Sequence, residues 1–147
     1  MKRRLFLICM PCAAFALTAT RMAFAQSTAS DSLYRDLHGR EGIVKLVDEL
    51  MPILLADGRI KHSFVDVDMK HLAASLADQF GVVSGGPEVY KGKDMLTVHQ
   101  DLKIDQAQFN ALVEDLQLAM DRQGIPSSVQ NRLLARLAPM HTQIISR

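Results

Sequence analysis

The sequence is poor in cysteine and in aromatic residues, and it has no tryptophan. Of its 147 residues, two are cysteines, Cys9 and Cys12, and both lie in an apolar stretch near the N-terminus. Beyond that stretch the chain has no thiol to form a disulfide, act as a nucleophile or bind a metal. These three chemistries are therefore excluded for the main part of the chain.

The chain also lacks an excess of charge of one sign and a second long apolar run. It contains 17 basic and 16 acidic residues, a formal net charge of +1. No basic stripe interleaved with aromatic residues is present, so we expect no nucleic-acid partner. No apolar stretch after the N-terminal one is long enough to span a bilayer.

The N-terminus has the pattern of a secretory signal peptide. Basic residues at positions 2–4 precede an apolar run from Leu5 to Ala19, and Ala23-Phe24-Ala25 offers small residues where signal peptidase cleaves. We predict a signal peptide over residues 1–25, a flexible segment over 26–32 and one folded domain over 33–147. Cleavage after Ala25 leaves 13 basic and 16 acidic residues and no membrane anchor. The expected location is the periplasm or the outside of the cell.

The periodicity of the remaining chain is helical. Apolar residues recur every three or four positions in four segments, and no segment alternates as a β-strand does. Asp105 and Gly124 are placed to begin and end the third helix, Pro126 suits the start of the fourth, and Pro52 and Pro139 interrupt the first and last. The four apolar stripes are Ile43, Leu46, Val47, Leu50 and Leu54; Met69, Leu72, Leu76, Phe80 and Val83; Phe109, Leu112, Val113, Leu116 and Met120; and Val129, Leu133, Leu137, Met140 and Ile144. An all-α domain follows.

The segment from Gly85 to His99 carries the strongest functional signal. It contains the glycine pair Gly85-Gly86, then Tyr90, Gly92 and a short apolar turn, and it ends on a single histidine. This order of residues is suited to presenting one nitrogen ligand to a pocket between helices.

Together with residues elsewhere, this segment resembles the group I truncated hemoglobins over residues 33–145. The resemblance implies a two-over-two helical sandwich that binds heme b noncovalently, with His99 as the proximal iron ligand. A planar apolar macrocycle needs a slot between helices, and its iron is commonly held by a neutral imidazole. The matching residues outside the segment are Leu33-Tyr34, Gly39-Arg40-Glu41-Gly42-Ile43, Leu55-Ala56-Asp57, Phe64, Leu102, Ile104, Phe109, Gly124, Pro126 and Ala138-Pro139.

The resemblance also assigns residues around the heme. The expected contacts are Met51, Phe64, Leu72, Leu76 and Met95, and Lys93, with Lys91 as a weaker alternative, is expected to meet a heme propionate. His62 and His141 are expected on the surface, and His38 replaces a glycine of the family's first turn. His71 is an alternative sixth iron ligand, because it directly precedes Leu72.

The distal side departs from the family pattern. Met51 stands where the family usually has a tyrosine, and Leu72 and Leu76 stand at two positions that are often polar. None of these three side chains donates a hydrogen bond, and losing one buried donor weakens oxygen binding by about 10- to 100-fold. Ser75 and Gln79, on neighbouring helix faces, are alternative donors.

Three functions from different classes follow. The first is reversible binding of O2, CO or NO at the heme. The second is a nitric oxide dioxygenase or peroxidase, which also needs an electron donor and a polar distal group, and the third is a heme carrier or a heme-free interaction domain. We favour ligand binding over an enzyme because the distal positions are apolar, and we expect a monomer or a weak homo-oligomer.

Overall fold

The computed structural model describes residues 33–146, and within this range the chain is helical without a strand. The predicted signal peptide and the segment 26–32 lie outside the described residues. Residues 33–36 are helical, and the further elements are α2 (Gly39–Ala56), the 3₁₀ turn η1 (Lys61–Phe64), α3 (Met69–Ser84), α4 (Met95–His99), α5 (Gln106–Arg122), α6 (Ser127–Leu137), the 3₁₀ turn η2 (Ala138–Met140) and α7 (His141–Ile144). The all-α prediction is confirmed.

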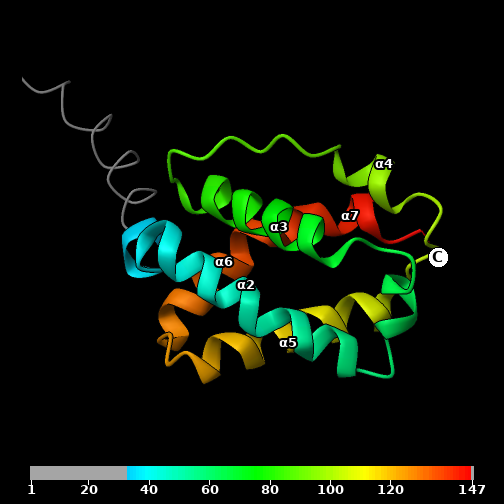
Figure 1. Ribbon diagram of the computed structural model, residues 1–147, viewed down its shortest axis with the longest axis horizontal. Helices are drawn as coiled ribbons and strands as arrows, with labels where there is room; N and C mark the ends of the chain where they lie inside the picture. The colour runs from blue at the N-terminus through cyan, green and yellow to red at the C-terminus, as the bar shows by residue number, and fades with distance from the viewer. Residues whose placement is uncertain (1–32, 147) are drawn as a thin grey trace, which may run out of the picture.

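Helix α2 is the centre of the fold. It packs against both α3 and α5, while α3 also contacts α6 (Figure 1). Its apolar stripe, which includes Leu46, Val47 and Leu54, is at most 1% exposed. Because the stripe recurs every three or four residues, one face of the helix meets both partners and the other face meets water.

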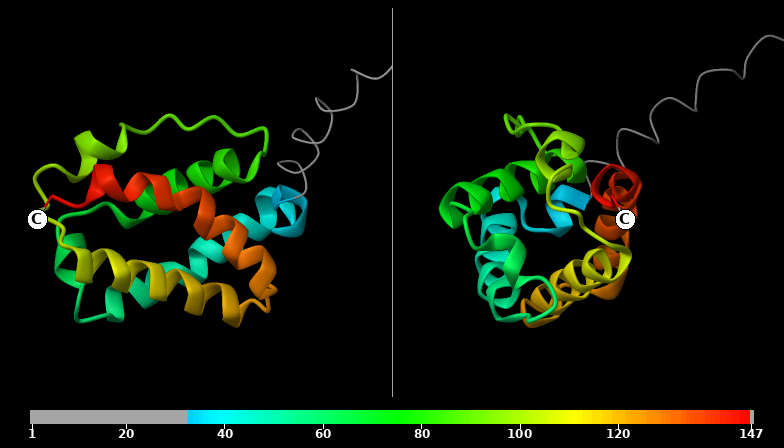
Figure 2. Two further views of the ribbon diagram at one scale, coloured as in Figure 1. Left: turned by 180° about the vertical axis from the view of Figure 1, so that it is seen from behind. Right: turned by 90° about the vertical axis from the view of Figure 1, so that its right-hand side faces the viewer.

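The short helix α4 and the C-terminal helix α7 lie side by side at one end of the molecule (Figure 2). The connection from α3 to α4, residues 85–94, runs back along the outside of α3 (Figure 1 and the left view of Figure 2). It begins where Gly85 adopts a left-handed conformation, φ +88°, and closes α3. This connection therefore carries His99 back along α3 to the far end of that helix.

The N-terminal end of the described chain is fastened to the same connection. Leu33 and Leu37 are buried in the core, and the Tyr34 hydroxyl donates a hydrogen bond of 2.6 Å to Oε1 of Glu88. Gly86 is required there because a Cβ on it would lie 2.3 Å from the Tyr34 ring. The aromatic ring and the connection thus pack closely.

The fourth predicted helix is not continuous. It ends at Leu137, and the chain passes through the η2 turn before α7 begins at His141. Pro139 lies in η2, where its missing N–H and fixed ring prevent a regular helix from passing through. The interruption expected at Pro52 does not occur, since α2 continues past this residue to Ala56.

Candidate functional site

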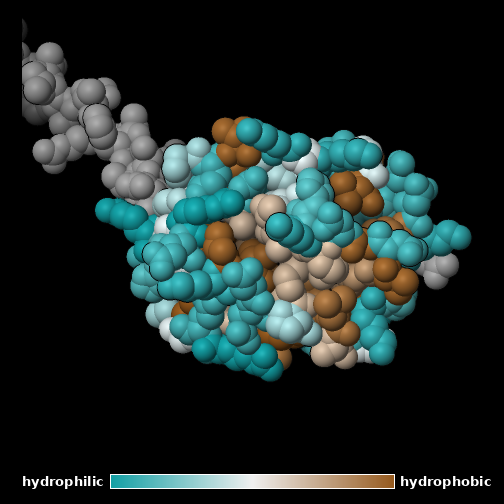
Figure 3. Space-filling model, in the orientation of Figure 1, coloured by the Kyte–Doolittle hydropathy of each residue, from teal (hydrophilic) through white to brown (hydrophobic). Residues whose placement is uncertain are grey.

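An apolar cavity lies where η1, α3, α4, α5 and α7 meet. Its volume is about 180 Å³. Figure 3 shows apolar side chains gathered on the right half of the face viewed, the end of the molecule that holds these elements. The lining residues are Leu54, Ile60, Ser63, Phe64, Val67, Leu72, Leu76, Val98, His99, Leu102, Ile104, Gln108, Phe109, Leu112 and Ile144.

His99 is the residue of this lining that carries a ring nitrogen. It is the last residue of α4, and its Nδ1 lies 2.7 Å from the carbonyl oxygen of Met95. A carbonyl only accepts hydrogen bonds, so Nδ1 carries a proton, and in the neutral imidazole Nε2 then keeps a free lone pair. The imidazole is therefore oriented and in the tautomer required of a metal ligand.

The local sequence explains how so short a helix is held. Asp94 caps α4, accepting hydrogen bonds from the backbone N–H of Thr97 at 2.9 Å and from its hydroxyl at 2.6 Å. The cap satisfies a backbone donor that a helix start leaves unpaired. Contacts with α7 support the other side of α4.

Four of the residues predicted for the site line this one cavity. Phe64 comes from η1, Leu72 and Leu76 from α3, and His99 from α4. Leu72 and Leu76 are four residues apart and so lie on the same face of α3. The structure thus brings together an imidazole and three apolar side chains from different elements.

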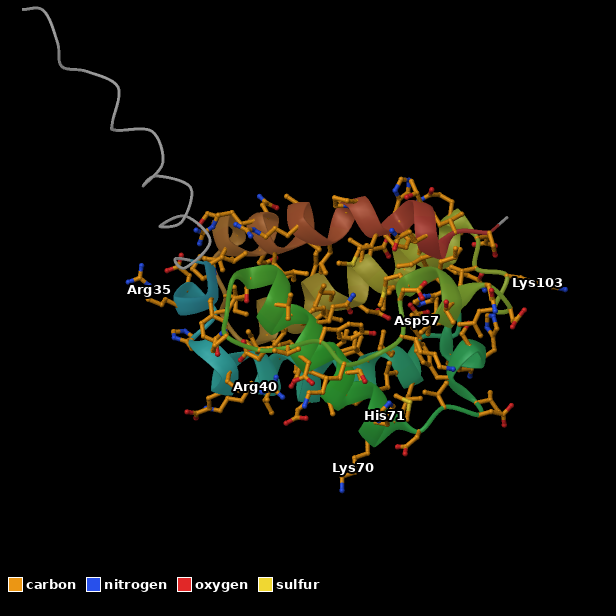
Figure 4. All side chains as sticks on the ribbon, turned by 90° about the horizontal axis from the view of Figure 1, so that it is seen from above. Arg35, Arg40, Asp57, Lys70, His71 and Lys103 are labelled. Carbon is orange, nitrogen blue, oxygen red and sulfur yellow. The ribbon has the colours of Figure 1, made fainter. Side chains whose placement is uncertain are left out.

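The other predicted site residues lie outside the lining. Met51 is half-buried and packs against the core, and Lys93 is exposed, with its carbonyl accepting a 3.0 Å hydrogen bond from the Tyr90 hydroxyl. His71 is exposed beside Lys70 at the beginning of α3, at the edge of the molecule in Figure 4. One residue along a helix is a rotation of about 100°, so His71 lies on a different face from Leu72.

Met95 and Gln79 form a contact next to the cavity. Gln79 on α3 is 9% exposed, and its Nε2 donates to Sδ of Met95 at 3.3 Å and to Sδ of Met140 at 3.2 Å. Ser75, the other alternative donor, is half-buried on α3 and does not line the cavity.

Several lining residues were not foreseen as site residues. Ile60 and Val67 lie in the connection between α2 and α3, which has no helical periodicity to mark a buried face. Gln108 lies in the first turn of α5, where its Oε1 accepts a hydrogen bond from the N–H of Asp105 at 3.0 Å. Of the unforeseen lining residues, Val98 could have been predicted from the sequence, because it directly precedes His99.

Three other features of the described residues bear on the site. They contain no group of three or more His, Cys, Asp or Glu side chains that could hold a metal ion. No helix among them is both long and apolar enough to cross a membrane. A shallow hollow on the other side of α2 is lined mainly by polar and charged side chains, among them His38, Glu41 and Lys45.

Comparison with known proteins matches nearly the whole described chain. Residues 32–146 match the family model described as bacterial-like globin. The group 1 truncated hemoglobin of Tetrahymena pyriformis is 31% identical over 100 residues, which cover 68% of this chain and 83% of the relative. A group 1 truncated hemoglobin of Synechocystis is 31% identical over 115 residues, covering 75% of this chain and 93% of the relative.

Solved structures show the same likeness. The Fe(III) form of truncated hemoglobin from Tetrahymena pyriformis superposes with a TM-score of 0.76 and 27% identity, covering 78% of this chain and 98% of that one. A 2/2 hemoglobin of Synechococcus with covalently attached heme has a TM-score of 0.73 and 23% identity, covering 78% and 98% of the two chains. The latter supports the fold alone.

Proposed function

This chain belongs to the bacterial-like globin family as a group I truncated hemoglobin, and from that membership we propose that it binds one noncovalent heme b in the cavity between α3 and α4. The proposed activity is reversible binding of diatomic gases. The observation that carries the proposal is the hydrogen bond between Nδ1 of His99 and the Met95 carbonyl, which leaves Nε2 free at an apolar cavity.

The residues present suit a heme. His99 supplies the imidazole ligand, and Phe64, Leu72, Leu76 and the apolar residues of α5 supply walls that exclude water. When bound, the heme supplies an iron atom at which a gas molecule can coordinate. Noncovalent binding is proposed because both cysteines lie within the first 12 residues of the chain.

The size of the cavity adds a requirement. Its volume of about 180 Å³ is below the range of about 300–1,000 Å³ usual for ligand sites. The lining side chains Val67, Val98 and Leu102 are 38–44% exposed, so they can move outward without opening the core. We therefore expect heme entry to displace these three side chains.

The distal chemistry follows from α3. Leu72 and Leu76, the residues of α3 that line the cavity, have aliphatic side chains without a hydrogen-bond donor. Oxygen gains more than carbon monoxide from a hydrogen-bond donor, because bound oxygen carries more partial negative charge. The proposed pocket therefore discriminates less in favour of oxygen than a pocket with a tyrosine donor.

Heme titration of the heme-free protein tests the proposal. The wild type should take up one heme with a defined Soret band, and His99→Ala should lose stable binding or regain a five-coordinate spectrum when imidazole is added. His71→Ala is the matched control, since its exposed side chain lies outside the cavity lining, and it should bind heme as the wild type does.

Two results would contradict this proposal. Equal heme affinity and equal ferrous spectra in the wild type and His99→Ala would exclude His99 as the ligand. A heme that stays with the protein during extraction into acidified ketone would exclude noncovalent binding.

A further inference from the structure

Three elements meet at one amide group beside the cavity. Nε2 of Gln79 on α3 donates to the thioether of Met95 on α4 at 3.3 Å and to that of Met140 in η2 at 3.2 Å. Met95 is also the residue whose carbonyl accepts the Nδ1–H of His99 at 2.7 Å. The side chain of Met95 is thus held by Gln79 while its backbone orients the imidazole.

The presence of Gln79 at this position is not explained by helix formation or core packing. Leu72, Leu76 and Gln79 fall at i, i+4 and i+7 on one face of α3, where a buried apolar residue is the usual choice. Thioether sulfur is a weak acceptor, so the amide gains less here than with an oxygen acceptor. A buried amide that is weakly paired suggests a role in positioning its partners.

The contact between Gln79 and Met95 is important because few other contacts hold α4 in place. The helix spans the five residues Met95–His99, and it is held by the Asp94 cap at its start and by α7 along its side. A displacement of Met95 moves the carbonyl that His99 uses, and the second-shell hydrogen bond of a histidine sets both its orientation and its strength as a metal ligand.

We propose that Gln79 is a positioning residue for the proximal imidazole and acts through Met95. It holds the Met95 side chain, so that the carbonyl of Met95 stays in line with Nδ1 of His99. The proposal rests on the proposed function, since it assigns to His99 the role of iron ligand.

The test combines Gln79→Leu, Met95→Leu and the double variant. In the heme-free protein, proton NMR should show faster solvent exchange of the His99 Nδ1 proton in Gln79→Leu. In the ferrous heme complex, resonance Raman should show the iron–imidazole stretch at lower frequency. Heme release should be about three- to tenfold faster. This range lies at or below the effect of about 10- to 100-fold that is usual when a hydrogen-bond partner of a metal ligand is lost.

The double variant distinguishes positioning from simple destabilisation. If Gln79 acts through the Met95 sulfur, Met95→Leu alone should reproduce the changes and the double variant should add nothing further. Gln117→Leu on α5 is the matched control, because it replaces a half-buried glutamine outside the cavity lining. It should leave all three measurements unchanged.

Failure of this inference is separable from failure of the heme proposal. Wild-type protein that binds heme through His99, with Gln79→Leu unchanged in proton exchange, stretching frequency and heme release, would overturn the positioning role. Additive effects in the double variant would overturn it as well. Heme binding that is independent of His99 would instead overturn the proposed function.

Discussion

At the scale of single residues, the ligand chemistry depends on which side chains reach the cavity. Leu76 is part of the lining, whereas Met51, which the family resemblance places near the bound gas, packs against the core outside it. A donor introduced at position 76 therefore belongs to the cavity lining, whereas one introduced at position 51 starts outside it.

Leu76→Gln should slow oxygen release by about tenfold or more, because one buried hydrogen bond to a partly charged group contributes about 1.5–3 kcal/mol. Carbon monoxide release should change much less. Stopped-flow displacement of each gas measures both effects, and Met51→Tyr is the comparison, with a smaller effect expected. Wild-type oxygen release already as slow as in Leu76→Gln would show that another donor acts in the pocket.

A second residue-scale effect concerns a buried carboxyl group on α5. Asp115 is 5% exposed, and its Oδ2 is buried without a hydrogen-bond partner among the described residues. Burial raises the pKa of Asp115, and repulsion from Asp57 adds to the increase. Since the folded pKa lies above the unfolded one, the contribution of Asp115 to stability is greatest below the unfolded pKa and is lost as pH rises through the folded pKa.

Asp115→Asn should therefore raise the free energy of unfolding at neutral pH by about 1 kcal/mol or more, the lower end of the cost of an unpaired buried group. The gain should shrink as the pH falls toward about 4, where an unfolded aspartate takes up its proton. Urea denaturation across this range provides the measurement, with the exposed Asp101→Asn as the control. A gain that is constant with pH would rule out titration of Asp115 as the cause.

At the scale of elements, the position where α5 begins determines which of its residues line the cavity. The Asp105 side chain accepts from the N–H of Gln108 at 2.8 Å, and Oε1 of Gln108 accepts from the N–H of Asp105 at 3.0 Å. This capping box fixes where the helix begins. It thereby fixes the register that points Gln108, Phe109 and Leu112 into the cavity.

Asp105→Ala should lower the free energy of unfolding by about 1 kcal/mol, the usual cost of losing an N-cap. Asp105→Asn keeps an oxygen acceptor and should lose much less. Thermal and urea denaturation of the two variants give the comparison. Equal losses would mean that the charge of Asp105, rather than its cap, stabilises the helix.

At the scale of the whole molecule, the domain is a set of helices around α2, with the cavity at the end where α4 and α7 lie together. The predicted signal peptide lies outside the described residues. We propose on the sequence pattern that the protein is exported to the periplasm or beyond the cell, with the globin domain as the mature product.

Export predicts a defined N-terminus. Protein from the native host should be recovered outside the cytoplasm and begin at Gln26, because signal peptidase recognises Ala23-Phe24-Ala25. N-terminal sequencing or intact-mass measurement tests this. Full-length protein found in the cytoplasm of that host would contradict the proposal.

The sequence by itself determined the class of the domain and its family. Helical spacing of apolar residues predicted the helices α2, α3 and α5 and the buried face of α2. Of the stripes predicted for the other two helices, only Phe80 in α3 and Leu116 and Met120 in α5 are buried. The residues around His99 predicted the truncated-globin family, which the comparisons confirm. These features were readable because periodicity and capping are local, so a few neighbouring residues are enough to specify them.

Only the tertiary structure decided which of these residues share a cavity. The position of Leu76 in the cavity lining and of Met51 outside it depends on how distant segments pack, and so does the contact of Gln79 with Met95 and Met140. Gln79 and Met140 are 61 positions apart in the chain, and no local pattern relates them. Their contact exists because α3, α4 and η2 converge, and convergence follows from the packing of the whole core rather than from the preferences of any one segment.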